Sequence, residues 1–347
     1  METVLSARQR QLAVEVADSS AVGAARRMAA DICARIALDE VACGQVALAT
    51  TEAATNILKH AGRGEILARP LVVDGRPGIE IIAIDRGPGM ANFARSAADG
   101  HTTAGSYGIG LGAMQRGTDF FDIHTAPGQG TVIAMRIYGR GGAGAPSAID
   151  IGAVCLPITG ETLCGDAWAV AAGPTLVTAL VADGLGHGPQ AAAASEAAAE
   201  IVERHPEQLP GALMQDVHAG LRGTRGAAAA LLRIDLIEDE LRFCGVGNIM
   251  ASVYESGSAI VGGTRRQMVS HNGIVGGNAH KIQEFTQPWR PGSLLVLCSD
   301  GLNTRWDLNR YPGLTERHPS VIAAVLYRDF ARGRDDVTVL VVREHGG

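Results

Sequence analysis

The chain has 347 residues, 46% hydrophobic and 19% charged, a composition that can bury large cores and predicts two globular domains. Its formal net charge of -6 and the lack of a basic block argue against a nucleic-acid partner. Six scattered cysteines without a C-x-x-C pair, no apolar run of membrane-spanning length and no signal pattern predict reduced thiols, no membrane association and a cytoplasmic location.

The first half is predicted to mix strands and helices. In chain order its elements are strand material over residues 4–16, helices over 19–38 and 41–61, a buried strand over 79–84, and a helix that begins in a glycine run at 105 and ends at 117. The second helix carries Glu52, Asn56 and His60 at four-residue steps, which places them on one face. A polar stripe of this kind is, by itself, typical of a solvent-exposed helix face.

Two glycine motifs give that stripe a second interpretation. The strand over 79–84 ends in an Asp-x-Gly-x-Gly pattern that begins at Asp85, and a Gly-x-Gly-Leu-Gly pattern begins at Gly108. A glycine cluster alone is also typical of a plain loop. As an ordered set, Glu52 with Asn56 and then the two glycine patterns resemble the GHKL ATP-binding fold, the Bergerat α/β sandwich, over residues 5–138.

The resemblance implies a role for each motif. Asn56 coordinates Mg²⁺, Glu52 activates or orients the attacking group, and Asp85 accepts a hydrogen bond from the adenine amino group of ATP. The later glycines let backbone N–H groups reach the phosphates at a helix N-terminus. The further residues that the resemblance assigns to ATP are Gly87, Gly89, Gly108, Gly110, Leu111, Gly112 and Thr131, the last as a support for Asp85.

The surroundings of these motifs narrow the resemblance. The residues before Asp18 leave no room for a phospho-accepting helical hairpin, and the short segment between Gly89 and Gly105 predicts a small lid over ATP. A compact domain of this kind is similar to the serine kinases and anti-sigma factors of bacterial partner-switching systems. Residues 52–65 look most like the switch kinase of the stressosome.

A glycine-rich stretch over residues 139–148 is predicted to be a flexible linker, which gives domains 1–138 and 149–347. In chain order the second half is predicted to contain strands over 149–156, 163–171 and 176–182, helices over 191–202 and 209–222, and strands over 227–237, 240–246, 294–298 and 337–342. Strands between helix layers indicate an α-β-β-α sandwich. The expected fold class is therefore α+β in two domains.

Aspartates recur at the strand ends of this second half. They are Asp166, Asp183, Asp300, Asp335 and Asp336, and two of them stand in Asp-Gly pairs. One Asp-Gly pair is most often just a turn. Carboxylates that distant parts of a chain deliver to strand ends, however, are what a two-metal site with oxygen ligands needs.

The order and spacing of these motifs resemble the metal-dependent protein phosphatases (PPM), specifically their bacterial SpoIIE-like branch, over residues 150–343. The resemblance implies that Asp183 bridges two Mn²⁺ or Mg²⁺ ions and that Gly184 contributes its carbonyl oxygen. The other implied ligands are Asp166, Asp300 and Asp335, with Asp336 kept beside Asp335. Two cations neutralise a phosphoserine ester and make hydroxide available near neutral pH.

Two details of the resemblance leave room for interpretation. His187 stands beside the site and is interpreted either as a proton carrier or as a residue that packs the turn. The early arginine with which the eukaryotic relatives bind phosphate has no recognisable counterpart, so the metal ions are expected to hold the substrate phosphate. The domain has no obvious extra flap, which is similar to the stressosome feedback phosphatase.

The sequence thus favours one polypeptide that joins a partner-switching serine kinase domain to a metal-dependent serine/threonine phosphatase domain. The expected partners are STAS-domain scaffold or antagonist proteins, with a sigma factor or a downstream phosphatase as further candidates. Two alternatives stay open for the first half. It is either a module that binds ATP and a sigma factor or antagonist without phosphotransfer, or an ATP sensor that regulates the phosphatase.

Overall fold

The computed structural model describes residues 3–6, 9–73, 75–91, 107–141, 148–255 and 263–344. Contacts divide the chain into two compact units, one of residues 10–144 with 312–328 and the other of residues 1–9, 145–311 and 329–347. Two segments are therefore grouped across the boundary expected from the order of the chain. Most of the expected linker over 139–148 lies outside the described residues.

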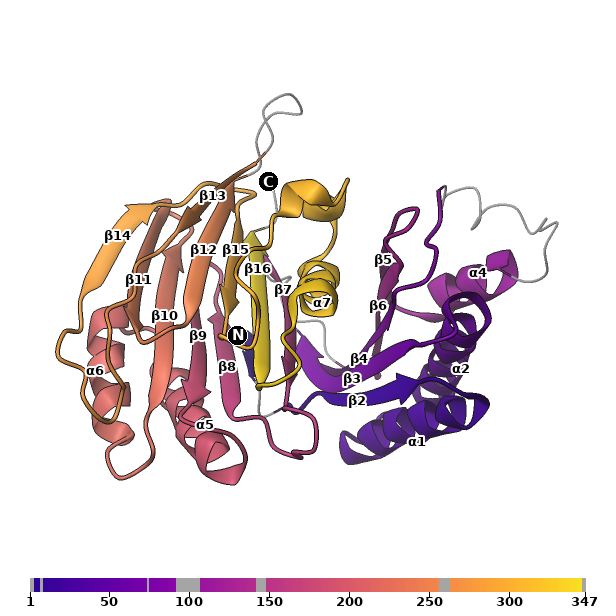
Figure 1. The fold of residues 1–347 in the computed structure, drawn as a ribbon, viewed down its shortest axis with the longest axis horizontal. Helices are drawn as coiled ribbons and strands as arrows, with labels where there is room; N and C mark the ends of the chain where they lie inside the picture. Colours follow the sequence, from indigo (N-terminus) through magenta and orange to yellow (C-terminus); the bar gives the residue numbers. More distant parts are fainter. Residues whose placement is uncertain are drawn as a thin grey trace. The chain divides into compact units, whose positions relative to one another are not determined.

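The unit built on residues 10–144 is an antiparallel five-stranded sheet in the order β2-β3-β4-β6-β5, with α1, α2 and α4 on one face (Figure 1). Its elements are β2 (Leu12–Val16), α1 (Ser19–Arg35), α2 (Glu40–Asn56), a π-helix (Ile57–Ala61), β3 (Gly64–Val73), β4 (Arg76–Asp85), α4 (Tyr107–Gly117), β5 (Phe120–Thr125), β6 (Thr131–Tyr138) and α7 (Pro319–Phe330). Aspartate side chains cap two of the helices, since Asp18 and Asp39 each accept hydrogen bonds from N–H groups of the first turn.

The helix predicted over residues 41–61 is α-helical only as far as Asn56. From Ile57 to Ala61 it is a π-helix, and the Gly62 N–H donates to the Ile57 carbonyl at 2.9 Å. The four-residue spacing that was expected to align His60 with Glu52 and Asn56 therefore fails in the last turn. Single turns of π-helix occur often at functional sites, and this one begins directly after Asn56, the residue expected to bind Mg²⁺.

The two faces of this sheet differ in chemistry. Along β4, Ile79, Ile81 and Ala83 point into the apolar core shared with α1 and α2. The alternation of a strand places Glu80 on the opposite face, where it is fully buried. There Glu80 is paired with Arg69 and Arg136, and the Ser320 hydroxyl of α7 donates to it at 2.6 Å.

The other unit contains two antiparallel sheets, in the orders β1-β8-β9-β10-β11-β14 and β13-β12-β15-β16-β7, which contact each other through β7, β8 and β16. Its elements are β1 (Thr3–Ser6), β7 (Ile149–Leu156), β8 (Asp166–Ala172), β9 (Leu176–Gly184), α5 (Pro189–Arg204), α6 (Pro210–Gly220), β10 (Ala227–Asp235), β11 (Glu240–Val246), β12 (Met250–Glu255), β13 (Thr264–Gln267), β14 (Glu284–Pro288), β15 (Leu294–Cys298) and β16 (Val337–Glu344). Helices α5 and α6 cover one face of the six-stranded sheet (Figure 1). The two-domain α+β class expected from the sequence is confirmed.

Two further observations concern the helices and the cysteines. No helix among the described residues is long and apolar enough to cross a membrane. All six cysteines are free thiols, four of them buried. The expected reduced thiols agree with this.

Candidate functional site

Five carboxylates gather where the two sheets of the second unit meet. Asp183 near the end of β9 lies directly across from Asp166 at the start of β8. Like charges that face each other across a strand pair destabilise a sheet. The other three are Asp300 after β15 and the Asp335-Asp336 pair before β16.

Glycines bring these segments close enough to form one cluster. A β-carbon on Gly184 would lie 2.1 Å from the Ala191 carbonyl oxygen, so α5 packs directly against the backbone beside Asp183. A β-carbon on Gly301 would lie 1.9 Å from the Asp336 carbonyl oxygen. Each Asp-Gly pair therefore needs its glycine for close backbone approach.

The carboxylates of the cluster repel one another. Burial and then the neighbouring charges of Asp300 and Asp335 raise the pKa of Asp183 to about 7. Burial and then the charge of Asp183 raise the pKa of Asp166 well above its ordinary value. A divalent cation relieves such repulsion, and these hard oxygen donors are the ligands that Mg²⁺ and Mn²⁺ prefer.

The hydrogen bonds of the cluster separate its members. The Ser299 hydroxyl donates to Asp166 at 2.6 Å, and the Asn248 amide donates to Asp300 at 2.7 Å. The carboxylate of Asp183 makes no hydrogen bond or ion pair within the described ranges, so it is available for a ligand. As the described side chains stand, no three carboxylate, histidine or cysteine groups converge tightly enough to hold an ion.

The two adjacent aspartates before β16 are not equivalent. Asp336 is buried and accepts hydrogen bonds from the N–H groups of Ile158 and Gly165, at 2.8 and 2.9 Å. Asp335 is exposed and accepts from the Asp336 N–H. This difference supports Asp335 as the ligand and Asp336 as the residue that holds the loop before Asp166 in place.

His187 lies four residues beyond Asp183 and has an acidic partner. Its Nδ1 lies 2.8 Å from Oε1 of Glu161, and the imidazole is exposed. Neither Glu161 nor Ser299 was expected at the site from the sequence. Ser299 precedes Asp300 directly, so its position was a usable signal, whereas Glu161 has no motif around it.

The unit built on residues 10–144 contains a small cavity between the C-terminal end of α2 and the sheet. It is lined by Ala53, Asn56, Ile57, Ala83, Asp85, Met90, Leu111, Thr131 and Ile133. Asp85 accepts hydrogen bonds from the N–H groups of Gly87 and Thr131, at 2.8 and 3.1 Å, and burial raises its pKa. Thr131 thus supports Asp85 through its backbone, because its hydroxyl contacts Thr125 at 3.2 Å.

Helix α4 closes over the two polar residues of α2. A β-carbon on Gly110 would lie 2.9 Å from Oε2 of Glu52 and 3.5 Å from Nδ2 of Asn56. Nδ2 of Asn56 is buried without a hydrogen-bond partner, as a group that awaits a ligand would be. The structure therefore brings Glu52 and Asn56 together with the second glycine motif. The Nδ2 group is a hydrogen-bond donor that fits a phosphate oxygen, and Oδ1 of the same amide is an oxygen ligand of the kind that Mg²⁺ prefers.

The remaining glycines of the motifs have different surroundings. Gly108 is in the first turn of α4, where backbone N–H groups are free of the helix ladder, whereas Gly112 is in the second turn and makes room for Arg116. Gly87 packs against Ala61, and Gly89, with φ of +65°, packs against the Ala126 carbonyl. Residues 92–106, which include most of the expected lid, lie outside the described residues.

Asp85→Asn is expected to weaken ATP binding by the full chain about 10-fold or more, because a hydrogen bond to a charged group is replaced and an amide N–H₂ faces the adenine amino group. Isothermal titration calorimetry with MgATP measures this. Asp31→Asn, an exposed aspartate of α1, is the matched control and should bind like the wild type. Equal affinities for the wild type and Asp85→Asn would remove Asp85 from the site.

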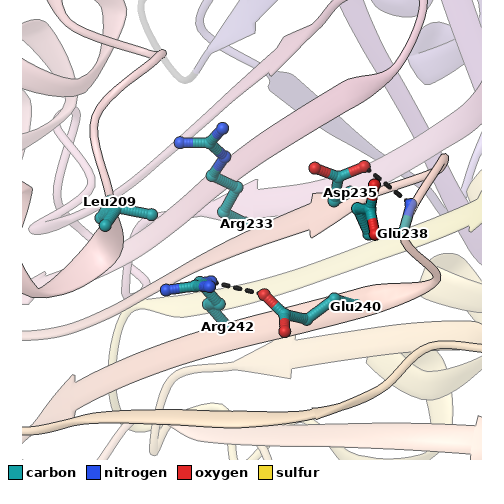
Figure 2. Close-up of a pocket in the computed structure, with 6 residues that line it drawn as sticks. All are labelled: Leu209, Arg233, Asp235, Glu238, Glu240 and Arg242. Carbon is teal, nitrogen blue, oxygen red and sulfur yellow. Dashed lines mark hydrogen bonds and ion pairs between the residues drawn. The ribbon is translucent and has the colours of Figure 1, made fainter.

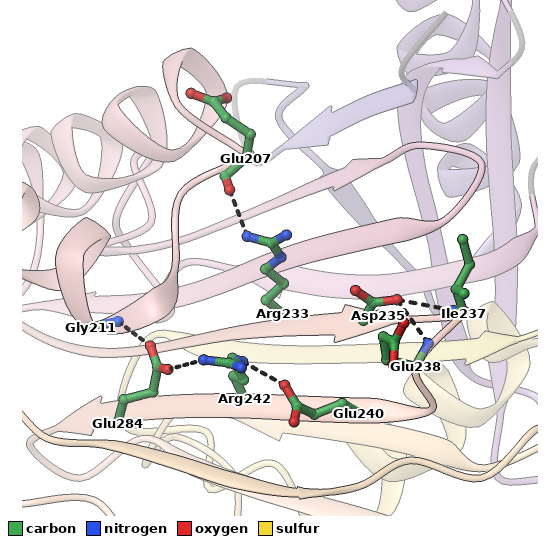
Figure 3. A network of polar contacts seen from close by, with 9 residues as sticks. All are labelled: Glu207, Gly211, Arg233, Asp235, Ile237, Glu238, Glu240, Arg242 and Glu284. Atoms are coloured by element: carbon green, nitrogen blue, oxygen red, sulfur yellow. Dashed lines mark hydrogen bonds and ion pairs between the residues drawn. The ribbon is translucent and has the colours of Figure 1, made fainter.

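A second hollow, at the far end of the six-stranded sheet from Asp183, has polar walls (Figure 2). It is lined by Leu209, Arg233, Asp235, Glu238, Glu240 and Arg242. The chain itself satisfies most of these groups (Figure 3): Arg242 pairs with Glu240 and Glu284, and Arg233 donates to the Glu207 carbonyl oxygen. This network ties α6 and β14 to the β10–β11 hairpin, which is a structural role.

Comparisons with known proteins assign each half to a different group. Residues 5–137 match the family model of the histidine kinase-like ATPase domain, and residues 173–345 match that of stage II sporulation protein E (SpoIIE). Serine/threonine-protein kinase RsbT of Bacillus subtilis (strain 168) is 33% identical over 110 residues, which are 32% of this chain and 83% of RsbT. Phosphoserine phosphatase RsbX of the same organism is 26% identical over 144 residues, 42% of this chain and 70% of RsbX.

A solved structure shares the fold of part of the chain. It comes from work on the bacterial stressosome as a modular system adapted to control secondary messenger signaling. It is 30% identical, with a TM-score of 0.51, over 56% of this chain and 99% of its own. The resemblances expected from the sequence are thereby confirmed for both halves.

Proposed function

Since the chain belongs to the histidine kinase-like ATPase family through its first half and to the SpoIIE family of phosphatases through its second, we propose that it adds and removes phosphate in one partner-switching pathway. The observation that carries the proposal is the fusion itself. One polypeptide contains a relative of a serine/threonine kinase and a relative of a phosphoserine phosphatase. The substrates that we propose are phosphoserine or phosphothreonine residues of STAS-domain partner proteins.

The acid cluster supports the phosphatase half of the proposal. Mn²⁺ or Mg²⁺ ions bound there would neutralise charge and lower the pKa of a water molecule for hydrolysis of a phosphate ester. Asp183, whose carboxylate has no partner within the described residues, would be a main ligand of these ions together with the Gly184 carbonyl oxygen. Ser299 and Asn248 orient Asp166 and Asp300, and Asp336 holds the loop from which Asp166 begins.

The cavity of the first unit supports ATP binding and, by proposal, phosphotransfer. We assign the selection of adenine to Asp85 and the binding of Mg²⁺ to the amide oxygen of Asn56, because both residues line this cavity. Glu52 lies next to Gly110, close to Asn56, where a base for the partner's hydroxyl group is needed. A half that only senses ATP or binds a partner would use Asp85 and Asn56 in the same way but would not need Glu52.

Glu52 therefore separates these readings. In the presence of MgATP and Mn²⁺, Glu52→Ala is expected to leave a STAS-domain partner without new phosphate, whereas Asp183→Asn should let phosphate accumulate on it. Mass spectrometry of the partner's serine and threonine residues measures both. If neither variant changes the phosphate level, or if both change it in the same direction, the opposed activities are refuted and the ATP-sensing function moves ahead.

A further inference from the structure

An arginine lies against the loop that follows Asp183. Nη1 of Arg225 is 3.0 Å from the position that a β-carbon on Gly186 would take, and Gly186 has φ of +85°. On another side the carbonyl oxygen of Gly186 is 3.3 Å from the β-carbon position of Gly165, the residue before Asp166. One layer of glycine backbone thus separates this guanidinium group from the acid cluster.

Hydrogen bonds fix the backbone of Arg225 relative to that loop. The Thr224 hydroxyl donates to the Leu221 carbonyl at 2.7 Å and accepts from the Gly226 N–H at 3.0 Å. The Gly226 carbonyl then accepts from the N–H of Leu185 at 3.0 Å. The turn that carries Arg225 is therefore tied to the residue two positions after Asp183, and only the arginine side chain is free to adjust.

The charge of Arg225 is not used elsewhere in the described structure. Its side chain is exposed and makes no hydrogen bond or ion pair with the described residues. Arg332 differs from Arg225 because its charge acts on Asp300. Burial and the charge of Asp335 raise the pKa of Asp300, and the charge of Arg332 acts to lower it. Arg225 thus keeps its guanidinium donors for a ligand at the edge of the site.

We propose that Arg225 binds the phosphoryl group of the substrate, a phosphoserine or phosphothreonine monoester. This inference rests on the phosphatase function proposed above. A phosphate dianion that approaches five carboxylates is repelled unless cations meet it. The planar guanidinium group can donate two parallel hydrogen bonds to two oxygens of one phosphate. A metal ion alone does not recognise the shape of the phosphate in this way. Arg225 then fills the role for which the sequence offered no recognisable arginine.

The test is steady-state kinetics of the full chain loaded with Mn²⁺, with a phosphoserine peptide as substrate and inorganic phosphate as product inhibitor. Arg225→Gln is expected to raise the KM for the peptide and the inhibition constant of phosphate by about 10-fold or more, with a smaller change in kcat. Arg225→Lys should fall between Arg225→Gln and the wild type. Arg222→Gln removes an exposed arginine from the same connection and should leave both constants at the wild-type value.

A structural role for Arg225 can be told apart by the binding of metal. If Arg225 binds only the substrate, the rise in melting temperature on addition of Mn²⁺ should be the same in Arg225→Gln and in the wild type. Loss of that rise in Arg225→Gln would overturn the inference. Unchanged constants in Arg225→Gln, or equal changes in Arg222→Gln, would also overturn it. A wild-type chain without metal-dependent phosphatase activity would instead refute the proposed function on which the inference rests.

Discussion

Asp183→Asn is expected to lower the phosphatase rate of the full chain at least about 100-fold. Asp183 lies opposite Asp166, its carboxylate has no partner among the described residues, and burial with the charges of Asp300 and Asp335 raises its pKa to about 7. These are the properties of a carboxylate that binds a metal cation. Stabilisation of transition-state charge by a metal ion is worth several kcal/mol, and about 1.4 kcal/mol corresponds to a factor of ten.

The control for this variant is Asp235→Asn. Asp235 lies on the same sheet at the far end of β10, where it accepts hydrogen bonds from the N–H groups of Ile237 and Glu238. It should keep wild-type activity. Mn²⁺ should raise the melting temperature of the wild type and of Asp235→Asn, and raise it much less in Asp183→Asn. Full activity in Asp183→Asn or in excess chelator would contradict the assignment of the cluster.

Local patterns predicted two apolar strands of the second unit closely. The strands expected over residues 149–156 and 294–298 have those bounds in β7 and β15. Both are apolar runs with turn signals at their ends, so the information is contained in neighbouring residues. The same holds for Asp183-Gly184 and Asp300-Gly301, whose aspartates lie at strand ends for local reasons.

The elements that were not predicted lack such a local signal. Strands β13 and β14 lie at sheet edges, the first is polar and the second ends in a proline, so neither has the pattern of a buried strand. Helix α7 is apolar on almost every side, and a short apolar run without helical periodicity cannot be told from a strand. The grouping of residues 312–328, which include most of α7, with residues 10–144 depends on contacts between residues far apart in the chain.

The candidate site shows the same division. The five aspartates and the glycine motifs could be named from the sequence because each stands in a recognisable pattern. Glu161 and Arg225 could not, since their place beside the Asp183 loop follows from side-chain and strand contacts between distant segments. The π-helical turn after Asn56 was also missed, because its residues have no composition that distinguishes it from an α-helix.

The second large effect concerns stability. Glu80→Gln is expected to lower the free energy of unfolding of the unit built on residues 10–144 by about 3 to 5 kcal/mol, because it removes the buried carboxylate with which Arg69 and Arg136 both pair. Both Arg69 and Arg136 are at least nine-tenths buried, and each pairs directly with Glu80. Glu15→Gln is the control: Glu15 forms an exposed pair with Arg63 on the same sheet, and such pairs contribute about 1 kcal/mol or less.

The stabilisation by Glu80 is expected to depend on pH, which an effect of packing alone would not. Burial by itself raises the pKa of Glu80, but Arg69 and Arg136 outweigh it and hold the pKa at about 2, below the ordinary 4.5. The stabilisation, about 3 kcal/mol for such a shift, is therefore complete above pH 4.5 and is lost as the pH falls from 4.5 toward 2. Two measurements on the full chain test this, thermal unfolding and hydrogen exchange of β3, β4 and β6. The difference in stability between the wild type and Glu80→Gln should be widest near neutral pH and should disappear in that acidic range. A gap that stays constant from pH 6 to pH 3 would mean that the glutamate acts through its shape and not through its charge.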